Sequence, residues 1–377
     1  MNIGITCYPS AGGSGIVATE LGQQLASRGH KVHFIAYAVP FRLDRFQKDL
    51  MYHGVEMTSY PLFKYPPYTL SLAAKMAEVA RNFDLDVMHV HYAIPHAVCA
   101  YLAQQLLVAN GDVKQPKIVT TLHGTDITLV GADPSYYDIT RFSINASDGV
   151  TAVSKYLADE TEEVFNTEKP IKVIHNFFDP TRFKPKSDAC TRSEFVADDE
   201  FLLAHVSNFR PVKRILDVID IFDRVQAELP ARLVLIGEGP DTVLARRQIT
   251  KRGLTDRVIF LGNQSRVEAV LPCADLFLGP SEEESFGLAA LEALACGVPV
   301  IGTSGTGLME VVDDFRNGFL LPVGDTAAMT RAAVSLLKDG ERLADFKKQA
   351  AELALHKFGA DKIVSQYEAF YQEVLDG

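Results

Sequence analysis

Two glutamates, Glu284 and Glu292, stand eight residues apart around the start of an apolar helical segment. We expect this helix to begin at residues 285–287, shortly after a buried strand at residues 276–278, with Glu292 about two turns inside it. The free N–H groups and the positive dipole end of a helix start suit a phosphate or a hydroxyl-rich ligand. Carboxylates beside such a start accept hydrogen bonds from sugar or ribose hydroxyls. The pattern therefore favours a nucleotide-sugar site, and the alternative is a helix stabilised by acidic residues in its first turn.

A pair of cations, Arg210 and Lys213, follows a predicted strand at residues 202–206. Arginine binds a phosphate through its planar fork and lysine binds it as a point charge, so the pair is suited to hold a diphosphate from one side. Asn263 and Gln264 follow a later strand and offer polar groups to a nucleobase. The second half of the chain thus carries candidates for each part of a nucleotide sugar.

A glycine-rich loop at residues 11–15 lies between the first predicted strand and the first predicted helix. Gly13, Gly15 and Ala18 match the spacing of a dinucleotide-binding fingerprint. That fingerprint needs an acidic residue near the end of the second strand to bind the ribose, and residues 35–38 contain none. We therefore interpret the loop as a place where the backbone approaches an anion or a sugar, with a merely tight turn as the alternative.

His123 comes directly after a predicted strand at residues 118–122, where the ligand-binding residues of open parallel sheets gather. Its neighbour Gly124 leaves the backbone accessible at the same point, so we interpret His123 as a site residue. The alternative is a histidine satisfied within the core. Arg141 opens a polar helical turn, where it serves either as a clamp for a carboxylate or as a solvated charge.

Two short patterns are of a kind that can bind metals. Asp84 and Asp86 form a D-x-D pair, but they precede the strand at residues 87–91, where Asp86 serves the turn. His89 and His91 alternate along that strand, and no third ligand stands at a suitable spacing. We therefore expect packing or supporting roles for these histidines and predict no metal site.

These candidates need a scaffold that gathers strand ends. Short apolar runs alternate with amphipathic helical segments, a pattern typical of parallel α/β architecture. Strands are expected at residues 3–6, 32–36, 87–91, 118–122, 149–152, 172–174, 202–206, 233–236, 258–260, 276–278 and 300–301. We predict two Rossmann-like domains, residues 1–168 and 169–359, that face each other across a cleft, with a helix at about 360–377 packed back on the first. The strand at 172–174 is expected to begin the second sheet, and the ligands are expected in the cleft.

Composition and charge exclude several classes of protein. The chain has 47% hydrophobic and 23% charged residues, as soluble globular proteins do, and its net charge of −11 disfavours nucleic-acid or anionic-membrane binding. Residues 3–7 are expected to form a first strand rather than a leader, and the longest apolar stretch, 286–301, is interrupted and too short to span a bilayer. The five cysteines are odd in number and lack a C-x-x-C pair, which predicts reduced thiols in the cytoplasm and neither disulfides nor a zinc site.

Together these motifs resemble the family-four retaining glycosyltransferases, which have the GT-B fold. The matching segments occur in family order over nearly the whole chain: Gly12-Gly-Ser-Gly15, Val173-Ile-His-Asn176 with Asp179, Arg210-x-x-Lys213, Gly237-x-Gly-Pro240 and Glu284-x7-Glu292. Within the first half, segments such as Pro40-Phe-Arg-Leu43 and Leu122-His-Gly-Thr-Asp126 resemble more narrowly the family members that act in bacillithiol biosynthesis. One departure is that the usual Asn-Gly after the linker strand is Asn176-Phe177 here.

The resemblance implies transfer of N-acetylglucosamine from UDP-N-acetylglucosamine to the hydroxyl of L-malate, with retention and without a metal or cofactor. The catalytic residues that it implies are Arg210, Lys213, His123 and Glu284. The donor-binding residues that it implies are Gly15, Asn263, Gln264, Ser285, Phe286, Gly287, Leu288 and Glu292. The acceptor-binding residues that it implies are Ser14, Tyr92, Thr121, Thr125 and Arg141.

Other functions stay open at this stage. The acceptor of such a transferase could instead be a lipid-linked sugar or an inositol phosphate. A UDP-N-acetylglucosamine 2-epimerase can share the two-domain architecture but needs no acceptor, and a sugar-nucleotide sensor would bind without turnover. With any of these functions the protein could form a homo-oligomer.

Overall fold

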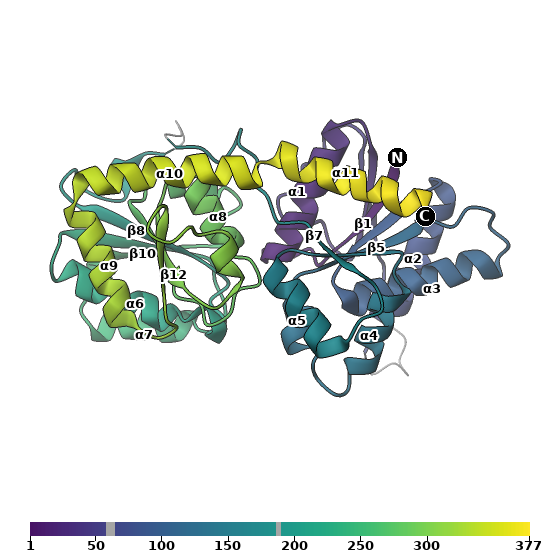
Figure 1. The fold of residues 1–377 in the computed structure, drawn as a ribbon, viewed down its shortest axis with the longest axis horizontal. Helices are drawn as coiled ribbons and strands as arrows, with labels where there is room; N and C mark the ends of the chain where they lie inside the picture. The colour runs from purple at the N-terminus through teal and green to yellow at the C-terminus, as the bar shows by residue number, and fades with distance from the viewer. Residues whose placement is uncertain (58–64, 186–189) are drawn as a thin grey trace. The chain divides into compact units, whose positions relative to one another are not determined.

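The chain folds into two compact units, each an α/β structure built on a parallel sheet (Figure 1). The computed structural model describes residues 1–57, 65–185 and 190–377. Unit 1 comprises Met1–Asn176 and Asp361–Gly377, and unit 2 comprises Phe177–Ala360. The prediction of an α/β fold with two Rossmann-like sheets is therefore confirmed.

Unit 1 contains a seven-stranded sheet in the order β3-β2-β1-β4-β5-β6-β7. Its strands are β1 (Asn2–Thr6), β2 (Lys31–Ala36), β3 (Leu50–Gly54), β4 (Val87–His91), β5 (Lys117–Leu122), β6 (Gly149–Ala152) and β7 (Ile171–Val173). All neighbouring pairs are parallel. Helices cover both faces, so β4 is buried along its whole length and β1 is buried from Ile3 to Thr6, polar side chains included.

The helices of unit 1 are α1 (Gly13–Ser27), α2 (Tyr68–Asn82), α3 (Val98–Ala109), α4 (Tyr137–Ala146), α5 (Lys155–Phe165) and α11 (Ala360–Asp376). On one face α2 and α3 pack together over a cluster that includes Ile35 and Val90. On the other face α1 packs against Phe34, and α11, drawn in yellow in Figure 1, lies beside α1 through ion pairs from Arg28 to Asp361 and Glu368. The C-terminal helix is thus part of unit 1.

Unit 2 contains a six-stranded parallel sheet in the order β10-β9-β8-β11-β12-β13. Its strands are β8 (Phe201–Val206), β9 (Ala231–Ile236), β10 (Val258–Gly262), β11 (Leu276–Gly279), β12 (Val300–Thr303) and β13 (Gly318–Leu321). Its helices are α6 (Ile215–Gln226), α7 (Thr242–Lys251), α8 (Leu288–Ala295), α9 (Thr326–Lys338) and α10 (Gly340–Phe358). In none of the described segments of either unit is there a helix long and apolar enough to cross a membrane.

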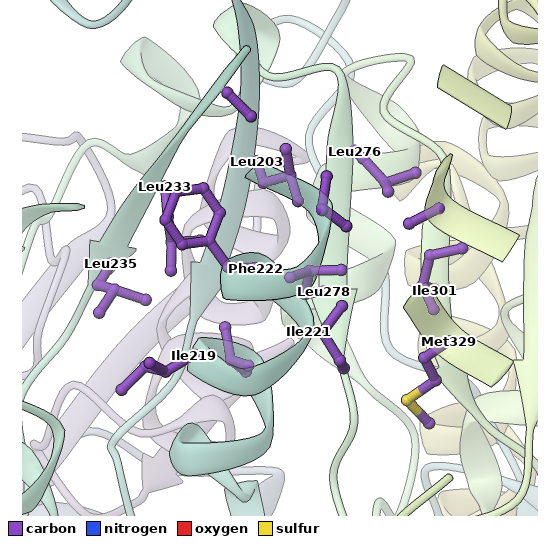
Figure 2. Packing of buried hydrophobic residues seen from close by; sticks show 14 of the residues in the cluster. Leu203, Ile219, Ile221, Phe222, Leu233, Leu235, Leu276, Leu278, Ile301 and Met329 are labelled. Atoms are coloured by element: carbon purple, nitrogen blue, oxygen red, sulfur yellow. The ribbon is translucent and has the colours of Figure 1, made fainter. Parts of the chain in front are cut away.

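A large apolar core holds one face of the unit 2 sheet to its helices. Figure 2 shows its members converging from strands β8, β9, β11 and β12 and from helices α6 and α9. The labelled side chains are Leu203, Ile219, Ile221, Phe222, Leu233, Leu235, Leu276, Leu278, Ile301 and Met329. Fully burying one aliphatic or aromatic side chain of this kind contributes roughly 1.5–3 kcal/mol, so this core fixes the strands whose ends carry the site.

Three strands differ from the prediction. The strand expected to begin the second sheet is β7, which instead pairs with β6 at the edge of the first sheet, in the register Val150 to Ile171. β3 (Leu50–Gly54) and β13 (Gly318–Leu321) were not predicted. All three are edge strands with one neighbour, so burial imposes a weaker pattern on them than on central strands.

The prediction of reduced thiols is wrong for two of the five cysteines. A disulfide joins Cys190 to Cys273 across 83 residues of sequence, with the two Cα atoms 5.7 Å apart. Such a separation leaves no local spacing signal, which is why the pairing could not be recognised in the sequence. Cys7, Cys99 and Cys296 are free and buried, as core-filling thiols are.

Candidate active site

The candidate site residues of unit 2 gather where the strand order reverses. β8 and β11 are neighbours in the sheet although β9 and β10 intervene in sequence, and ligands of open parallel sheets bind at the carboxyl ends of strands beside such a switch point. A pocket opens there between the two strand ends and the start of α8. It is lined by His205, Val206, Ser207, Phe277, Gly279, Ser281, Glu284, Gly287, Ala289, Ala290 and Leu308.

Lys213 and Glu284 form an ion pair at this pocket. Lys213 Nζ lies 2.6 Å from Glu284 Oε1, and both side chains are about four-fifths buried. The hydroxyl of Ser281 donates to the same carboxylate oxygen at 3.0 Å. The structure therefore brings together two of the predicted catalytic residues, from the turns that follow β8 and β11, and leaves a charged amino group where a phosphate could compete for it.

The loop that presents Lys213 is held in an unusual backbone conformation. Phe209 and Arg214 have positive φ angles of 40° and 51°, which cost free energy in residues that carry a Cβ. Phe209 is fully buried and Ser207 Oγ accepts its backbone N–H at 3.2 Å, so packing and hydrogen bonding fix this conformation. Arg210, between these residues, is exposed and available to a ligand.

Helix α8 begins later than its sequence predicts. Gly287 has a φ of 97°, a left-handed conformation that an α-helix cannot contain, so the helix starts at Leu288. A Cβ on Gly287 would come within 2.7 Å of Leu308 Cδ1, and no side chain caps this end. The backbone N–H groups of the first turn are therefore left for a ligand. Glu292 lies just over one turn inside the helix, rather than two, and is buried.

The remaining donor candidates lie at the rim of unit 2 or line its loops. Asn263 and Gln264 follow β10 and are exposed. Ser285 and Phe286 precede α8, and Phe286 is buried against Phe358. Asn263 and Gln264 near the base, and Ser285 and Phe286 near the sugar, stay predictions.

Unit 1 has a switch point of its own, between β1 and β4. Ser14 lies in the first turn of α1, and its hydroxyl is 3.3 Å from the phenol oxygen of Tyr92, directly after β4. A Cβ on Gly15 would approach the carbonyl oxygen of Tyr8 to 2.5 Å, so only glycine fits there. Two of the predicted acceptor residues thus meet at the point where ligands of open sheets bind.

Asp126 lies among the candidate residues of unit 1, and its role was not predicted from the sequence. Its buried carboxylate accepts backbone N–H groups from His123 at 3.1 Å, Gly124 at 3.0 Å and Ala93 at 2.9 Å. Burial raises the pKa of this carboxyl, and the backbone N–H bonds oppose that shift. Asp126 therefore joins the loop of His123 to the loop that follows Tyr92. The signal for it was an aspartate three residues after His123, a spacing at which the side chain can close its own turn.

The two threonines predicted to bind the acceptor, Thr121 and Thr125, differ in burial. Thr121 is completely buried, and its hydroxyl lies 2.7 Å from both His89 Nε2 and Thr151 Oγ1. Thr121 therefore lies within the core of unit 1, bonded to the two strands beside β5, and its acceptor role stays a prediction. Thr125 remains partly exposed. Arg141 lies on α4, which packs against the turn after Tyr92, and its guanidinium is 4.0 Å from Glu168.

A cluster of histidines lies beneath these loops. His91 Nδ1 is 2.8 Å from His123 Nε2, and His89 Nδ1 is 2.7 Å from the hydroxyl of Tyr371 on α11. Burial lowers the pKa of His89 and of His123 to about 3, and it holds the pKa of His91 well below its usual value. These rings are neutral at physiological pH, and both nitrogens of His89 have partners, which confirms its supporting role.

These features define a glycosyltransferase with two Rossmann-like units. The family model described as Glycosyltransferase Family 4 matches residues 11–182, and the model described as Glycosyl transferases group 1 matches residues 188–353. The chain belongs to this family, and its prediction as a GT-B glycosyltransferase is confirmed.

The chain is also similar to individual proteins of known sequence or structure. The chain is 47% identical over 376 residues to N-acetyl-alpha-D-glucosaminyl L-malate synthase of Bacillus anthracis, covering 100% of this chain and 97% of that protein. It is 34% identical to 2-deoxystreptamine N-acetyl-D-glucosaminyltransferase of Streptomyces fradiae, covering 97% of this chain and 93% of that one. HepE of Anabaena, solved with UDP and glucose, shares the fold at a TM-score of 0.80 with 20% identity and 99% coverage of both chains.

Proposed function

We propose that this protein transfers N-acetylglucosamine from UDP-N-acetylglucosamine to the hydroxyl of L-malate, with retention of the anomeric configuration, and releases UDP. The observation that carries the proposal is the 47% identity to a protein of that activity along the entire chain, through both units. The described site is compatible with it, since unit 2 presents a charged amino group and a free helix start at its switch point.

In this proposal Lys213 and Arg210 stabilise the leaving diphosphate. The bond from the anomeric carbon to the β-phosphate oxygen breaks, and the malate hydroxyl adds to the same face of the sugar. The departing phosphate oxygen takes the hydroxyl proton, so no carboxylate nucleophile is needed. Removing one contact to the charge that develops in a transition state lowers the rate by about 10²–10³, so we expect a loss of this size when Lys213 is replaced.

The other proposed roles concern binding of the donor and of the acceptor. Glu284 and the N–H groups at the start of α8 hold the sugar hydroxyls, Glu292 binds the ribose, and Asn263 with Gln264 lies near the base. Malate is a small dicarboxylate, for which Arg141 supplies charge and the hydroxyls of Ser14, Tyr92 and Thr125 supply hydrogen bonds. No metal is required in this proposal because lysine and arginine neutralise the diphosphate, so a chelator should leave the rate unchanged.

The deciding experiment measures UDP release from UDP-N-acetylglucosamine with and without L-malate, with the product checked by mass and its anomeric configuration by NMR. Malate-dependent release of an α-linked product supports the proposal. UDP binding without malate-dependent release would overturn malate as the acceptor. Arg141→Ala should raise the KM for malate at least tenfold with little change in the KM for the donor, and equal changes in both would remove Arg141 from the acceptor site.

A further inference from the structure

His91 and His123 form a direct contact between two imidazole rings in unit 1. His91 is completely buried in β4, and His123 follows β5 and keeps part of its surface exposed. Their nitrogens Nδ1 and Nε2 lie 2.8 Å apart, the distance of a hydrogen bond. The Nδ1 atom of His123 is thus the nitrogen left to meet a ligand.

One proton must lie between these two nitrogens. Both rings are neutral, since burial lowers both pKa values far below 7, so each ring carries one N–H. Either His91 donates from Nδ1, or His123 donates from Nε2. The tautomer of His123, and therefore whether its outward nitrogen is a donor or an acceptor, depends on which ring donates.

The surroundings of His91 favour one of these arrangements. Its Nε2 is buried and has no hydrogen-bond partner. If His123 donated, the proton of His91 would sit on this Nε2 as a buried, unpaired N–H, a group that folded proteins rarely tolerate. If His91 donates from Nδ1, its Nε2 carries only a lone pair, and His123 carries its proton on the outward Nδ1.

Neighbouring groups hold this arrangement in place. His96 Nδ1 donates to the carbonyl oxygen of His91 at 2.6 Å, which fixes the backbone at the end of β4. The ring of His89 lies against that of His91 with centroids 4.4 Å apart. On the other side, the ring of Tyr92 stacks on His123 with centroids 5.6 Å apart. His123 is therefore constrained in both position and rotation.

We propose that His91 is a positioning residue, which donates a hydrogen bond from Nδ1 to His123 Nε2 and so fixes His123 as an outward Nδ1–H donor toward the substrates. The inference rests on the proposed function and on the catalytic role that the family resemblance implies for His123. A donor at this point can bind a carboxylate or hydroxyl oxygen, whereas the alternative tautomer could only accept a hydrogen bond from a hydroxyl.

The test compares three substitutions at His91. Asn carries its amide nitrogen at the same bond distance from the backbone as Nδ1, so His91→Asn can keep the donor, while His91→Gln places its amide further out and His91→Leu has none. We expect kcat to fall about 10–100-fold in His91→Leu and His91→Gln, with the KM for the donor within twofold, because a misplacement of about 1 Å costs about 10²-fold. His91→Asn should stay within about threefold of the wild-type kcat.

A matched control lies in the same sheet. His33 on β2 is also buried, and its Nδ1 lies 3.0 Å from His53 Nε2, so His33→Leu removes a comparable pair of rings away from the site. It should lower thermal stability as His91→Leu does while leaving kcat unchanged. A wild-type kcat in His91→Leu, or an equal loss in His91→Asn, would overturn the positioning role.

The tautomer of His123 can be measured independently of the enzymatic activity. ¹⁵N NMR of the histidine side chains should show the His123 proton on Nδ1 in the wild-type protein and a mixed tautomer in His91→Leu. A wild-type proton on Nε2 would refute the inference whatever the activity. If the wild-type protein shows no malate-dependent release, the proposed function fails, and the NMR result still decides how the two rings are paired.

Discussion

Asp126 joins two loops of unit 1 through three backbone N–H groups, and its removal gives a sharp test of that role. Its oxygens accept from His123, Gly124 and Ala93 at 2.9–3.1 Å, and the side chain is 1% exposed. Asp126→Ala would leave all three N–H groups without a partner in a buried site. Each buried unpaired donor costs about 1–3 kcal/mol, so we expect a loss of at least about 3 kcal/mol in the free energy of unfolding of unit 1.

Asp126→Asn provides a graded comparison. Its amide oxygen can still accept from His123 and Gly124, but its NH₂ group then faces the N–H of Ala93, so two donors oppose each other. We expect a loss of about 1–3 kcal/mol, smaller than that of the alanine variant. Asp133 also accepts a backbone N–H, from Ser135 at 2.8 Å, but it is exposed. Asp133→Ala is therefore the control and should cost less than about 1 kcal/mol.

Calorimetric unfolding measures these losses. A loss of about 3 kcal/mol should lower the Tm of unit 1 by roughly 6–12 °C, and UDP should raise the Tm of whichever transition belongs to unit 2. Malate-dependent turnover should fall with the Tm in both Asp126 variants, because His123 and the loop after Tyr92 lose their common anchor. An Asp126→Ala protein with a wild-type Tm would refute the reasoning, as would an asparagine variant less stable than the alanine variant.

Three further outcomes follow from other parts of the structure. Burial lowers the pKa of His89 from 6.5 to about 3, so between these pH values the unfolded chain binds more protons than the folded chain. The contribution of His89 to stability is therefore complete above pH 6.5 and is lost as the pH falls toward 3. The Tm of unit 1 should therefore decline between pH 6.5 and 5, and a flat profile would contradict this. Reducing the Cys190–Cys273 disulfide should raise the number of free thiols from three to five. It should also destabilise unit 2 by up to about 4–5 kcal/mol, the chain-entropy value for a loop of 83 residues. An unchanged urea midpoint after reduction would contradict this prediction. Lys213→Met should lower kcat by about 10²–10³, whereas Lys155→Met, which removes an exposed ion pair with Asp159, should not.

Central strands could be predicted closely because burial on both faces leaves a signal in the sequence. The bounds of β4 (Val87–His91) and β6 (Gly149–Ala152) agree with the predicted residues. The edge strand β7 was assigned to the wrong sheet, since its three residues contain no information about which neighbour they pair with. Sheet membership is a long-range property, and local apolar runs do not encode it.

The candidate site was predictable where motifs follow strand ends and unpredictable where contacts cross the sheet. Lys213 and Glu284 could be proposed separately, but 71 residues separate them and only the fold shows that they form an ion pair. The same limit applies to His91, whose partner His123 lies on the loop of the next strand. Thr121 is a further case, because its hydrogen bonds to His89 and Thr151 cross from β5 to both neighbouring strands.

The chain passes from unit 1 to unit 2 after Asn176 and returns after Ala360, so unit 2 is inserted within the sequence of unit 1. During synthesis, all residues of unit 2 are made before the helix that supplies Tyr371 to His89. Domains generally fold as they emerge, which would let unit 2 complete its core while unit 1 still lacks one layer. The unit whose synthesis begins first is therefore completed last. A released chain truncated after residue 360 should have a protease-resistant unit 2 and a protease-sensitive unit 1.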